Sequence, residues 1–229
     1  MRLLAFDTAT RHLSVALWRD GEFIERAAEV PNGGSECLLP WVHELLAEAG
    51  LGLAQIDGVA FGAGPGGFTG LRLACGVAQG LAWGLDIPAL PVSTLEALAL
   101  ESGEGDVWVC LDARMNEVYG AAYAVGGDAV RQLMAPVCMP PTVVPVPGFA
   151  GGRAVGDGFA TYGSVLQARK ADLAEVCPDL FPTAAGILRL AAPVFLHGHG
   201  LTAAEAQPIY VRDKVALTTA ERIARGGAK

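Results

Sequence analysis

Three glycines in the stretch GAGPGGFTG, residues 62–70, have the spacing of a phosphate-binding turn. Gly62, Gly64 and Gly67 read G-x-G-x-x-G, the pattern by which a strand-to-helix turn brings backbone N–H groups against a pyrophosphate. The chemistry implied is nucleotide binding. Glycines in a tight turn also serve purely structural ends, so the neighbouring elements must decide between the two.

Those neighbours do not match a dinucleotide site. Such a site places the glycines after the first strand of a parallel unit, with an acidic residue at the end of the second strand. Here three strands with a hairpin precede the glycines, and Asp86 comes before the strand at 87–92 instead of ending it. Pro65 removes one N–H from the turn, and no Lys follows as in a P-loop. We expect a turn that leads onto a helix N-terminus, where free N–H groups attract an anion.

Other polar residues give weaker signals. The turn Asp7-Thr8-Ala9-Thr10 is similar to the first phosphate loop of actin-like ATPases and sugar kinases, although these are also ordinary turn residues. Asp112 and Arg114 indicate an ion pair or a functional patch. His197 and His199 lack further ligands for a metal. The cysteines are odd in number and form no CxxC pair, which favours reduced thiols over disulfides or zinc: Cys37, Cys75, Cys110, Cys138 and Cys177.

Composition indicates a folded, acidic protein. Hydrophobic residues make up 52% of the chain and charged residues 17%, the opposite of a disordered sequence. The net charge of −8 opposes unaided binding to RNA or DNA. The N-terminus reaches Asp7 too early for a signal peptide, and the apolar run 71–85 is too short to cross a bilayer. We therefore expect a cytoplasmic protein.

Hydrophobic periodicity predicts two tandem α/β halves with mixed sheets, divided as 1–100 and 101–229. In the first half we expect strands at 2–6, 13–18, 23–30, 57–62 and 87–92 and helices at 35–49, 69–85 and 93–99, with Ser35 and Ser93 as N-caps. In the second half we expect strands at 107–112, 118–125 and 129–137, an extended loop at 140–147, and helices at 161–170 and 184–197. Residues 218–229 are expected to fray.

The first two predicted helices carry more apolar surface than one sheet face needs. Glycines four residues apart in the second helix each cost about 1 kcal/mol relative to Ala, so another element must approach closely. Either the chain's own core or a partner can supply it. The predicted partner interface comprises Leu38, Leu39, Trp41, Val42, Leu45 and Leu46 of the first helix, and Leu71, Gly76, Gly80, Trp83 and Gly84 of the second.

Six ordered blocks of sequence together resemble the TsaB (YeaZ) family of bacterial proteins. They are LLAFDTAT at 3–10, GPGGFTGLR at 64–72, GVAQGLAWG at 76–84, PVSTLEALA at 91–99, LDARMNEVY at 111–119 and PIYVRD at 208–213. The resemblance runs from residue 1 to about residue 215. It implies an actin-like (ASKHA, ribonuclease H-like) fold of two α/β subdomains.

The resemblance also implies a function and partners. Members of this family are non-catalytic subunits of the complex that makes threonylcarbamoyladenosine at position 37 of tRNA. They pair with the catalytic paralogue TsaD and are joined by the ATPase TsaE. From the apolar surface of the two helices we expect a homodimer when the paralogue is absent, and from the acidic charge we expect contact with tRNA only through the complex. ATP, ADP and metal then belong to the partners. The nucleotide cleft is degenerate in the family, and here it corresponds to Asp7, Thr8, Thr10, Gly64, Gly66 and Gly67. An autonomous actin-like ATPase or sugar kinase is the alternative.

Overall fold

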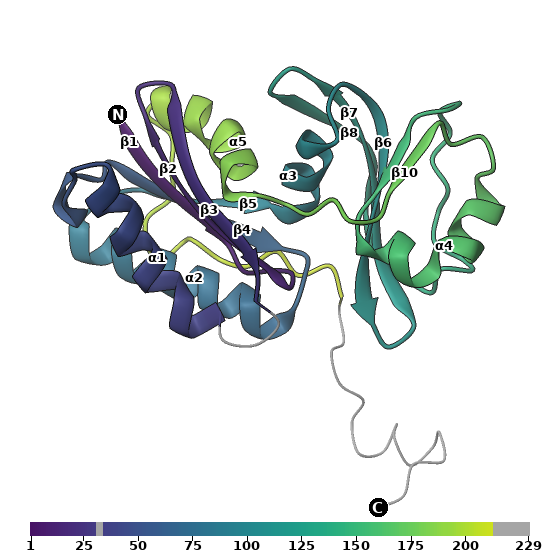
Figure 1. The fold of residues 1–229 in the computed structure, drawn as a ribbon, viewed down its shortest axis with the longest axis horizontal. Coiled ribbons are helices and arrows are strands. Elements are labelled where there is room, and N and C mark those ends of the chain that lie inside the picture. Colours follow the sequence, from purple (N-terminus) through teal and green to yellow (C-terminus); the bar gives the residue numbers. More distant parts are fainter. Residues whose placement is uncertain (31–33, 213–229) are drawn as a thin grey trace, which may run out of the picture.

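The computed structural model describes residues 1–30 and 34–212. They form two lobes that lie side by side (Figure 1), each built on a five-stranded mixed sheet. The first sheet has the order β3-β2-β1-β4-β5, and the second has the order β10-β9-β6-β7-β8. Among the described helices, none is long and apolar enough to cross a membrane.

The first lobe follows the predicted order of elements closely. Its strands are β1 (Arg2–Asp7), β2 (His12–Arg19), β3 (Glu22–Glu29), β4 (Gly58–Gly64) and β5 (Ala89–Ser93). Its helices are α1 (Gly34–Glu48), α2 (Phe68–Leu85) and α3 (Thr94–Glu101), with a short 3₁₀ turn, η1, at Leu53–Gln55. Ser93 caps α3 as predicted, since its hydroxyl accepts a hydrogen bond from the N–H of Glu96. The Ser35 prediction is wrong, because α1 already begins at Gly34.

The second lobe contains short strands that periodicity missed. Its elements are β6 (Gly105–Arg114), β7 (Glu117–Gly126), β8 (Ala129–Met139), β9 (Arg153–Val155), α4 (Asp157–Arg169), β10 (Glu175–Cys177) and α5 (Ala184–Leu196). The three-residue strands β9 and β10 are too short to show alternation. Helix α4 begins four residues earlier than expected, and the expected fraying of 218–229 lies outside the described residues.

The two sheets have the same topology, strand for strand. In the first, β2 and β3 run antiparallel beside β1, whereas β4 and β5 run parallel to it. In the second, β7 and β8 run antiparallel beside β6, whereas β9 and β10 run parallel to it. The predicted fold of two tandem α/β subdomains with mixed sheets is confirmed.

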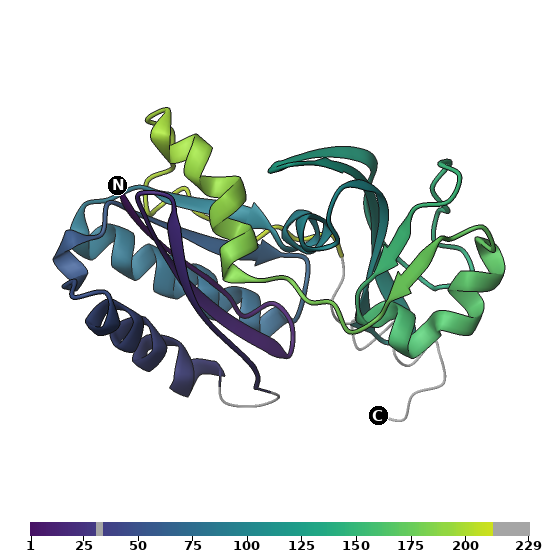
Figure 2. The same ribbon diagram turned by 45° about the horizontal axis from the view of Figure 1, so that its top comes forward.

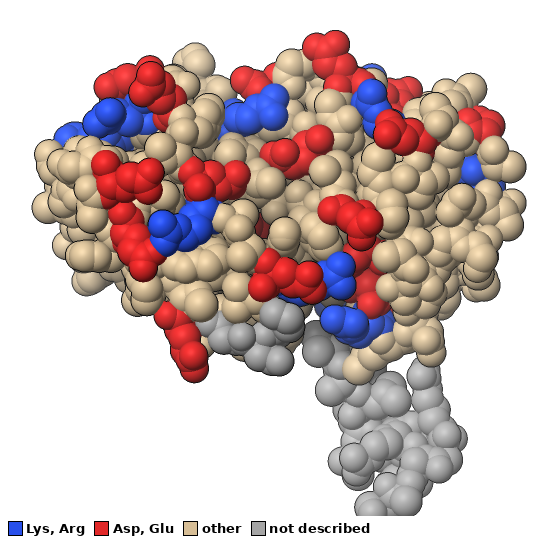
Figure 3. Space-filling model, in the orientation of Figure 1, with Lys and Arg blue, Asp and Glu red and all other residues tan. Residues whose placement is uncertain are grey.

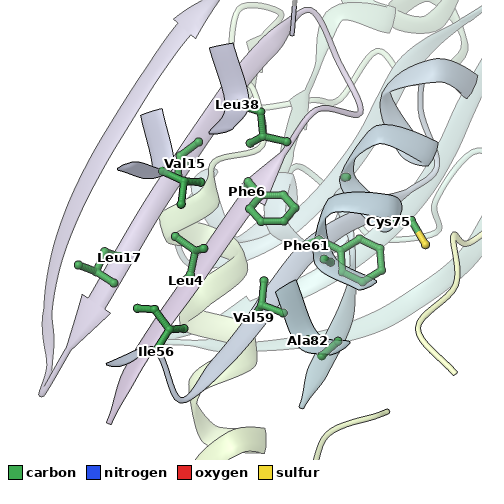
Figure 4. Close-up of a cluster of buried hydrophobic side chains, with 14 of the residues drawn as sticks. Leu4, Phe6, Val15, Leu17, Leu38, Ile56, Val59, Phe61, Cys75 and Ala82 are labelled. Atoms are coloured by element: carbon green, nitrogen blue, oxygen red, sulfur yellow. The ribbon is translucent and has the colours of Figure 1, made fainter. Parts of the chain in front are cut away.

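Period-two alternation sends neighbouring residues of the first sheet into different cores. Leu4 and Phe6 of β1 pack with α1 and α2 on one face (Figure 4). Leu3 and Ala5 pack with α5 on the other face. Helix α5 therefore covers the first sheet although it follows the second sheet in sequence, an arrangement that the turned view makes clear (Figure 2).

Helix α3 makes the reciprocal contribution, because Leu95 and Leu98 belong to the core under the second sheet. After α5, residues 201–212 return along the first lobe. They begin with a bridge between Leu201 and Ala89, and we call them the strap. The division of the chain at residues 100 and 101 remains a prediction.

Candidate functional site

A cleft of about 910 Å³ opens between the two lobes. One wall comes from the β1–β2 turn and from the glycine loop that leads into α2. The other wall comes from the β6–β7 hairpin and from the first residue of α4, and the strap closes one side. The lining residues most relevant to chemistry are Thr8, Thr10, Arg11, Gly66, Gly67, Arg72, Asp112, Arg114, Asp157, Tyr210 and Arg212.

Asp7 is fully buried and does not line this cleft. Its carboxylate accepts a hydrogen bond of 2.6 Å from the N–H of Ala9 and one of 3.2 Å from the hydroxyl of Thr94. The Thr94 hydroxyl accepts in turn from the N–H of Gly64. Burial raises the pKa of Asp7 from 3.8 to about 6, a rise that the hydrogen bonds from Ala9 and Thr94 oppose.

The glycines at 62, 66 and 70 allow the β1–β2 turn to lie directly on the loop. A Cβ added to Gly62 would overlap the Asp7 carboxylate, and one added to Gly70 would overlap the carbonyl oxygen of Thr8. A Cβ at Gly66 would lie 2.5 Å from the carbonyl oxygen of Ala9. Close backbone approach is thus what these glycines permit, and the partner in that approach is the chain itself.

Hydrogen bonds join the same two segments. The N–H of Gly67 donates to the carbonyl of Ala9 at 2.7 Å, and the hydroxyl of Thr8 donates to the carbonyl of Gly70 at 2.7 Å. The predicted cleft residues are therefore brought together, but they are not equally accessible. Thr8, Thr10, Gly66 and Gly67 line the cleft, whereas Asp7 and Gly64 lie behind it.

The second lobe places a matching turn on the opposite wall. The Asp112 carboxylate accepts a hydrogen bond of 2.8 Å from the N–H of Arg114, and it pairs with the Arg114 guanidinium at 3.2 Å. The ion-pair interpretation of these two residues is therefore confirmed. Arg114, Met115 and Asn116 all have φ between 55° and 60°, a left-handed run that is costly for residues other than Gly.

Asp157, at the start of α4, supports this turn. Its carboxylate accepts a hydrogen bond of 2.9 Å from the N–H of Asp112. Burial is the main cause that raises the pKa of Asp157. Asp157 was not among the predicted site residues, because its helix was expected to begin at residue 161.

The strap joins both lobes at the cleft. On the first lobe, the N–H of Ile209 donates to the carbonyl of Ala63 at 2.7 Å, and the Gln79 amide donates to the carbonyl of Ala206 at 2.8 Å. On the second lobe, the Arg212 guanidinium donates to the carbonyl of Ala113 and to the Glu117 carboxylate. Arg72 and Arg212 stand in two of the recognised sequence blocks, but neither was singled out, because spacing alone gives an arginine no role.

The predicted interface residues divide sharply by burial. Five of them are at most 4% exposed in the core of the first lobe and have no surface to offer a partner: Leu38, Val42, Leu45, Leu46 and Leu71. Leu39 and Trp83 are 50% and 80% exposed. The predicted partner interface is therefore reduced to the outward residues of the two helices. Trp41 is half-buried, intermediate between the buried and the exposed residues.

Gly76, Gly80 and Gly84 lie on the outward side of α2. A Cβ added to any of the three would have nothing within 4 Å. The row is therefore not explained by close packing among the described residues of the chain. A flat strip of exposed helix backbone beside an exposed tryptophan is the result.

The described residues do not assemble a metal site. Within 1–30 and 34–212, no three His, Cys, Asp or Glu side chains lie close enough together to hold an ion. His197 and His199 are exposed, and the His197 ring contacts the carbonyl of Pro193. All five cysteines are free.

Comparisons with known proteins give a consistent result over both lobes. A family model described as TsaD, tRNA N6-adenosine threonylcarbamoyltransferase, matches residues 32–216. The tRNA threonylcarbamoyladenosine biosynthesis protein TsaB of Haemophilus influenzae is 36% identical over 232 residues, which cover 94% of this chain and 95% of that protein.

Solved structures agree with these matches. A Pseudomonas aeruginosa crystal structure, described as an uncharacterized protein with similarity to peptidase YEAZ, superimposes with a TM-score of 0.85 at 38% identity, covering 92% of this chain and 99% of the other. YeaZ from the same organism gives a TM-score of 0.84 at 38% identity, with 91% and 99% covered.

Proposed function

Because the chain belongs to the TsaB family, we propose that it takes part in the biosynthesis of threonylcarbamoyladenosine in tRNA, as the name of its Haemophilus influenzae relative states for that protein. We propose further that it is an accessory subunit without catalytic activity of its own and acts in the cytoplasm. Its partners in this proposal are the paralogue TsaD, which carries out the transfer, and the ATPase TsaE.

The burial of Asp7 carries the non-catalytic part of this proposal. An actin-like ATPase needs the carboxylate of its first phosphate loop to face the metal-nucleotide complex. Here that carboxylate is fully buried and bonded to Ala9 and Thr94. The glycine loop is likewise packed against the chain's own turn. Reaching a nucleotide would require both contacts to break.

The outward side of α1 and α2 supports the pairing with TsaD. Trp83 is 80% exposed, and it lies next to Gly80 on the helix surface. Because glycine has no Cβ, a second helix can approach α2 closely, and an exposed aromatic side chain can anchor such an interface. In the absence of the paralogue, a second copy of the chain would cover the same surface.

Pairing can be tested with variants that leave the monomer intact. Gly80→Leu adds a side chain into open space, and Trp83→Glu places a charge at an exposed position. We expect each to weaken association with TsaD at least about ten-fold in titration calorimetry. The matched control is Gly148→Leu, where an added Cβ also meets nothing within 4 Å. Unchanged affinity of both folded variants would place the interface elsewhere.

An autonomous actin-like ATPase or sugar kinase remains the alternative, since the cleft occupies the place between the lobes where such enzymes bind nucleotide. Calorimetry with ATP and Mg²⁺ on the isolated chain separates the two. Micromolar binding with turnover would favour the enzyme, and we expect neither. A peptidase is not favoured, because no Ser, Thr or Cys side chain of the described residues hydrogen-bonds to a histidine ring.

A further inference from the structure

An exposed cluster of two aromatic rings and one arginine lies at the mouth of the cleft. Phe68 and Arg72 come from the first turns of α2, and Tyr210 comes from the strap. The Arg72 guanidinium carbon is 3.2 Å from the centroid of the Phe68 ring and 5.4 Å from that of Tyr210. The two rings are 48% and 51% exposed. We call these three residues the mouth cluster.

The lining of the cleft is less acidic than the chain as a whole. Four arginines and two carboxylates line it, whereas the chain as a whole has a net charge of −8. On the face shown in Figure 3, acidic and basic side chains are both spread over the surface, and some of each lie near the lower centre, where the two lobes meet.

Arg72 differs from the other arginines of the cleft. Arg11 pairs with Glu29 at 3.4 Å, Arg114 with Asp112, and Arg212 with Glu117. In the part of the chain that the structure describes, no carboxylate lies within 4.0 Å of Arg72; its guanidinium lies against the Phe68 ring. The Arg72 guanidinium also donates a hydrogen bond of 3.5 Å to the carbonyl of Phe68. Among the described residues it is therefore held by a ring and a carbonyl, and neither of these neutralises its charge.

We propose that the mouth cluster binds unpaired nucleotides of the substrate tRNA within the assembled complex, an inference that rests on the proposed function. Bases stack on the exposed faces of Phe68 and Tyr210, and the Arg72 guanidinium contacts a phosphate between them. Aromatic side chains bind single-stranded RNA in this way with little dependence on sequence. The acidic chain repels RNA in isolation, so the cluster acts after the partner has bound the tRNA.

The chemistry of the surroundings favours RNA over a protein segment. A protein hot spot is sealed by surrounding residues that exclude water. The neighbours of the mouth cluster in the cleft include Gly66, Gly67 and Thr69, which leave the rings accessible. They also include the apolar residues Ile209 and Met115, which are 38% and 71% exposed and do not seal the cluster from water.

Photo-crosslinking in the complex tests which occupant is present. Tyr210→p-benzoylphenylalanine places a photoreactive group at the cluster, and the same substitution at Phe23, 40% exposed on β3, is the control. With TsaD and tRNA present, we expect an RNA adduct at position 210 and none at position 23. A protein adduct at 210, or no adduct, overturns the proposal.

Binding measurements provide the second test. In the TsaD-bound state, Phe68→Ala and Tyr210→Ala are each expected to weaken tRNA binding by roughly ten-fold. Arg72→Ala is expected to reduce the salt dependence by about one phosphate contact. The control is Arg131→Ala, an exposed arginine on β8. Equal tRNA affinity in all variants refutes the cluster, and loss of TsaD pairing in them shows a protein contact instead. Failure of the unaltered chain to pair with TsaD is a separate result and refutes the proposed function itself.

Discussion

Asp7 and Asp112 occupy equivalent positions in the two lobes and make the same hydrogen bond. Each lies at or near the end of the first strand of its sheet, and each accepts a bond from the N–H two residues later, at 2.6 Å from Ala9 and 2.8 Å from Arg114. Asp7 is fully buried, whereas Asp112 lines the cleft and pairs with Arg114. The two lobes therefore share this local hydrogen-bonded structure, but its aspartate is buried in the first lobe and lines the cleft in the second.

The burial of Asp7 predicts an unusual dependence of stability on pH. Its pKa is raised from 3.8 to about 6, so the folded state favours the neutral carboxyl. The contribution of Asp7 to the free energy of unfolding is fully present below pH 3.8 and is lost as the pH rises through about 6. A difference of this size corresponds to about 3 kcal/mol. Relative to the unaltered protein, Asp7→Asn should gain unfolding free energy between pH 4 and 7, as measured by urea denaturation.

Asp57 provides the opposite control. A hydrogen bond from Arg2 lowers the pKa of Asp57, so its contribution is present at neutral pH and is lost on acidification. Asp57→Asn should therefore lose stability at pH 7 and little at low pH. If the Asp7→Asn curve runs parallel to that of the unaltered protein, Asp7 does not titrate in this range.

The glycines of α2 should respond to substitution in opposite directions. Gly76→Ala meets nothing within 4 Å and should stabilise the monomer by about 0.5–1 kcal/mol, because Ala is the better helix former. Gly70→Ala would overlap the carbonyl of Thr8 and should destabilise the monomer by about 1–3 kcal/mol. Thermal unfolding of both variants measures this contrast. Similar effects at both positions would contradict the assigned packing.

Periodicity predicted the long elements because their apolar patterns extend over several turns or strand pairs. Helix α2 and strand β2 are examples. The start of α3 was predicted by a local signal instead, because Ser93 is its N-cap. Periodicity missed β9 and β10, whose three residues pair only through contacts distant in sequence.

The candidate site was harder to predict for a related reason. Whether Asp7 faces a ligand or the core depends on Thr94 and on the glycine loop, which are far away in the sequence. The apolar arc of α1 likewise did not distinguish buried Leu45 from exposed Leu39. A leucine looks the same in the sequence whether it is buried or exposed, and only the packing of the helix against the sheet decides between the two.

That difference can be measured by placing a charge on each helix. Leu45 is 2% exposed and belongs to the first core, so Leu45→Glu should destabilise the monomer by about 3–5 kcal/mol or prevent folding. Trp83→Glu should change monomer stability by only about 0.5 kcal/mol, because the side chain is 80% exposed. Circular dichroism melts at low protein concentration separate folding from pairing. Comparable melting temperatures for the two variants would contradict this assignment.

Arg212 should hold the strap against the second lobe. Its guanidinium bonds to Ala113 and Glu117 on either side of the left-handed turn. Hydrogen bonds to a charged group contribute about 1.5–3 kcal/mol, so Arg212→Ala should speed amide exchange in residues 113–119 by roughly ten-fold or more. Exchange in α1 is the internal reference. Uniform acceleration over the whole chain would indicate global destabilisation instead of release of the strap.

The charge balance predicts that the isolated chain does not bind tRNA detectably at physiological salt. A net charge of −8 repels a polyanion, and the few arginines of the cleft are mostly paired with carboxylates. Electrophoretic shifts should therefore appear only after TsaD is added, and they should weaken as salt rises. Lowering the salt for the isolated chain should not restore binding, because reduced screening strengthens the repulsion as well. A salt-sensitive complex between tRNA and the isolated chain would show that the local charge of the cleft outweighs the charge of the whole protein.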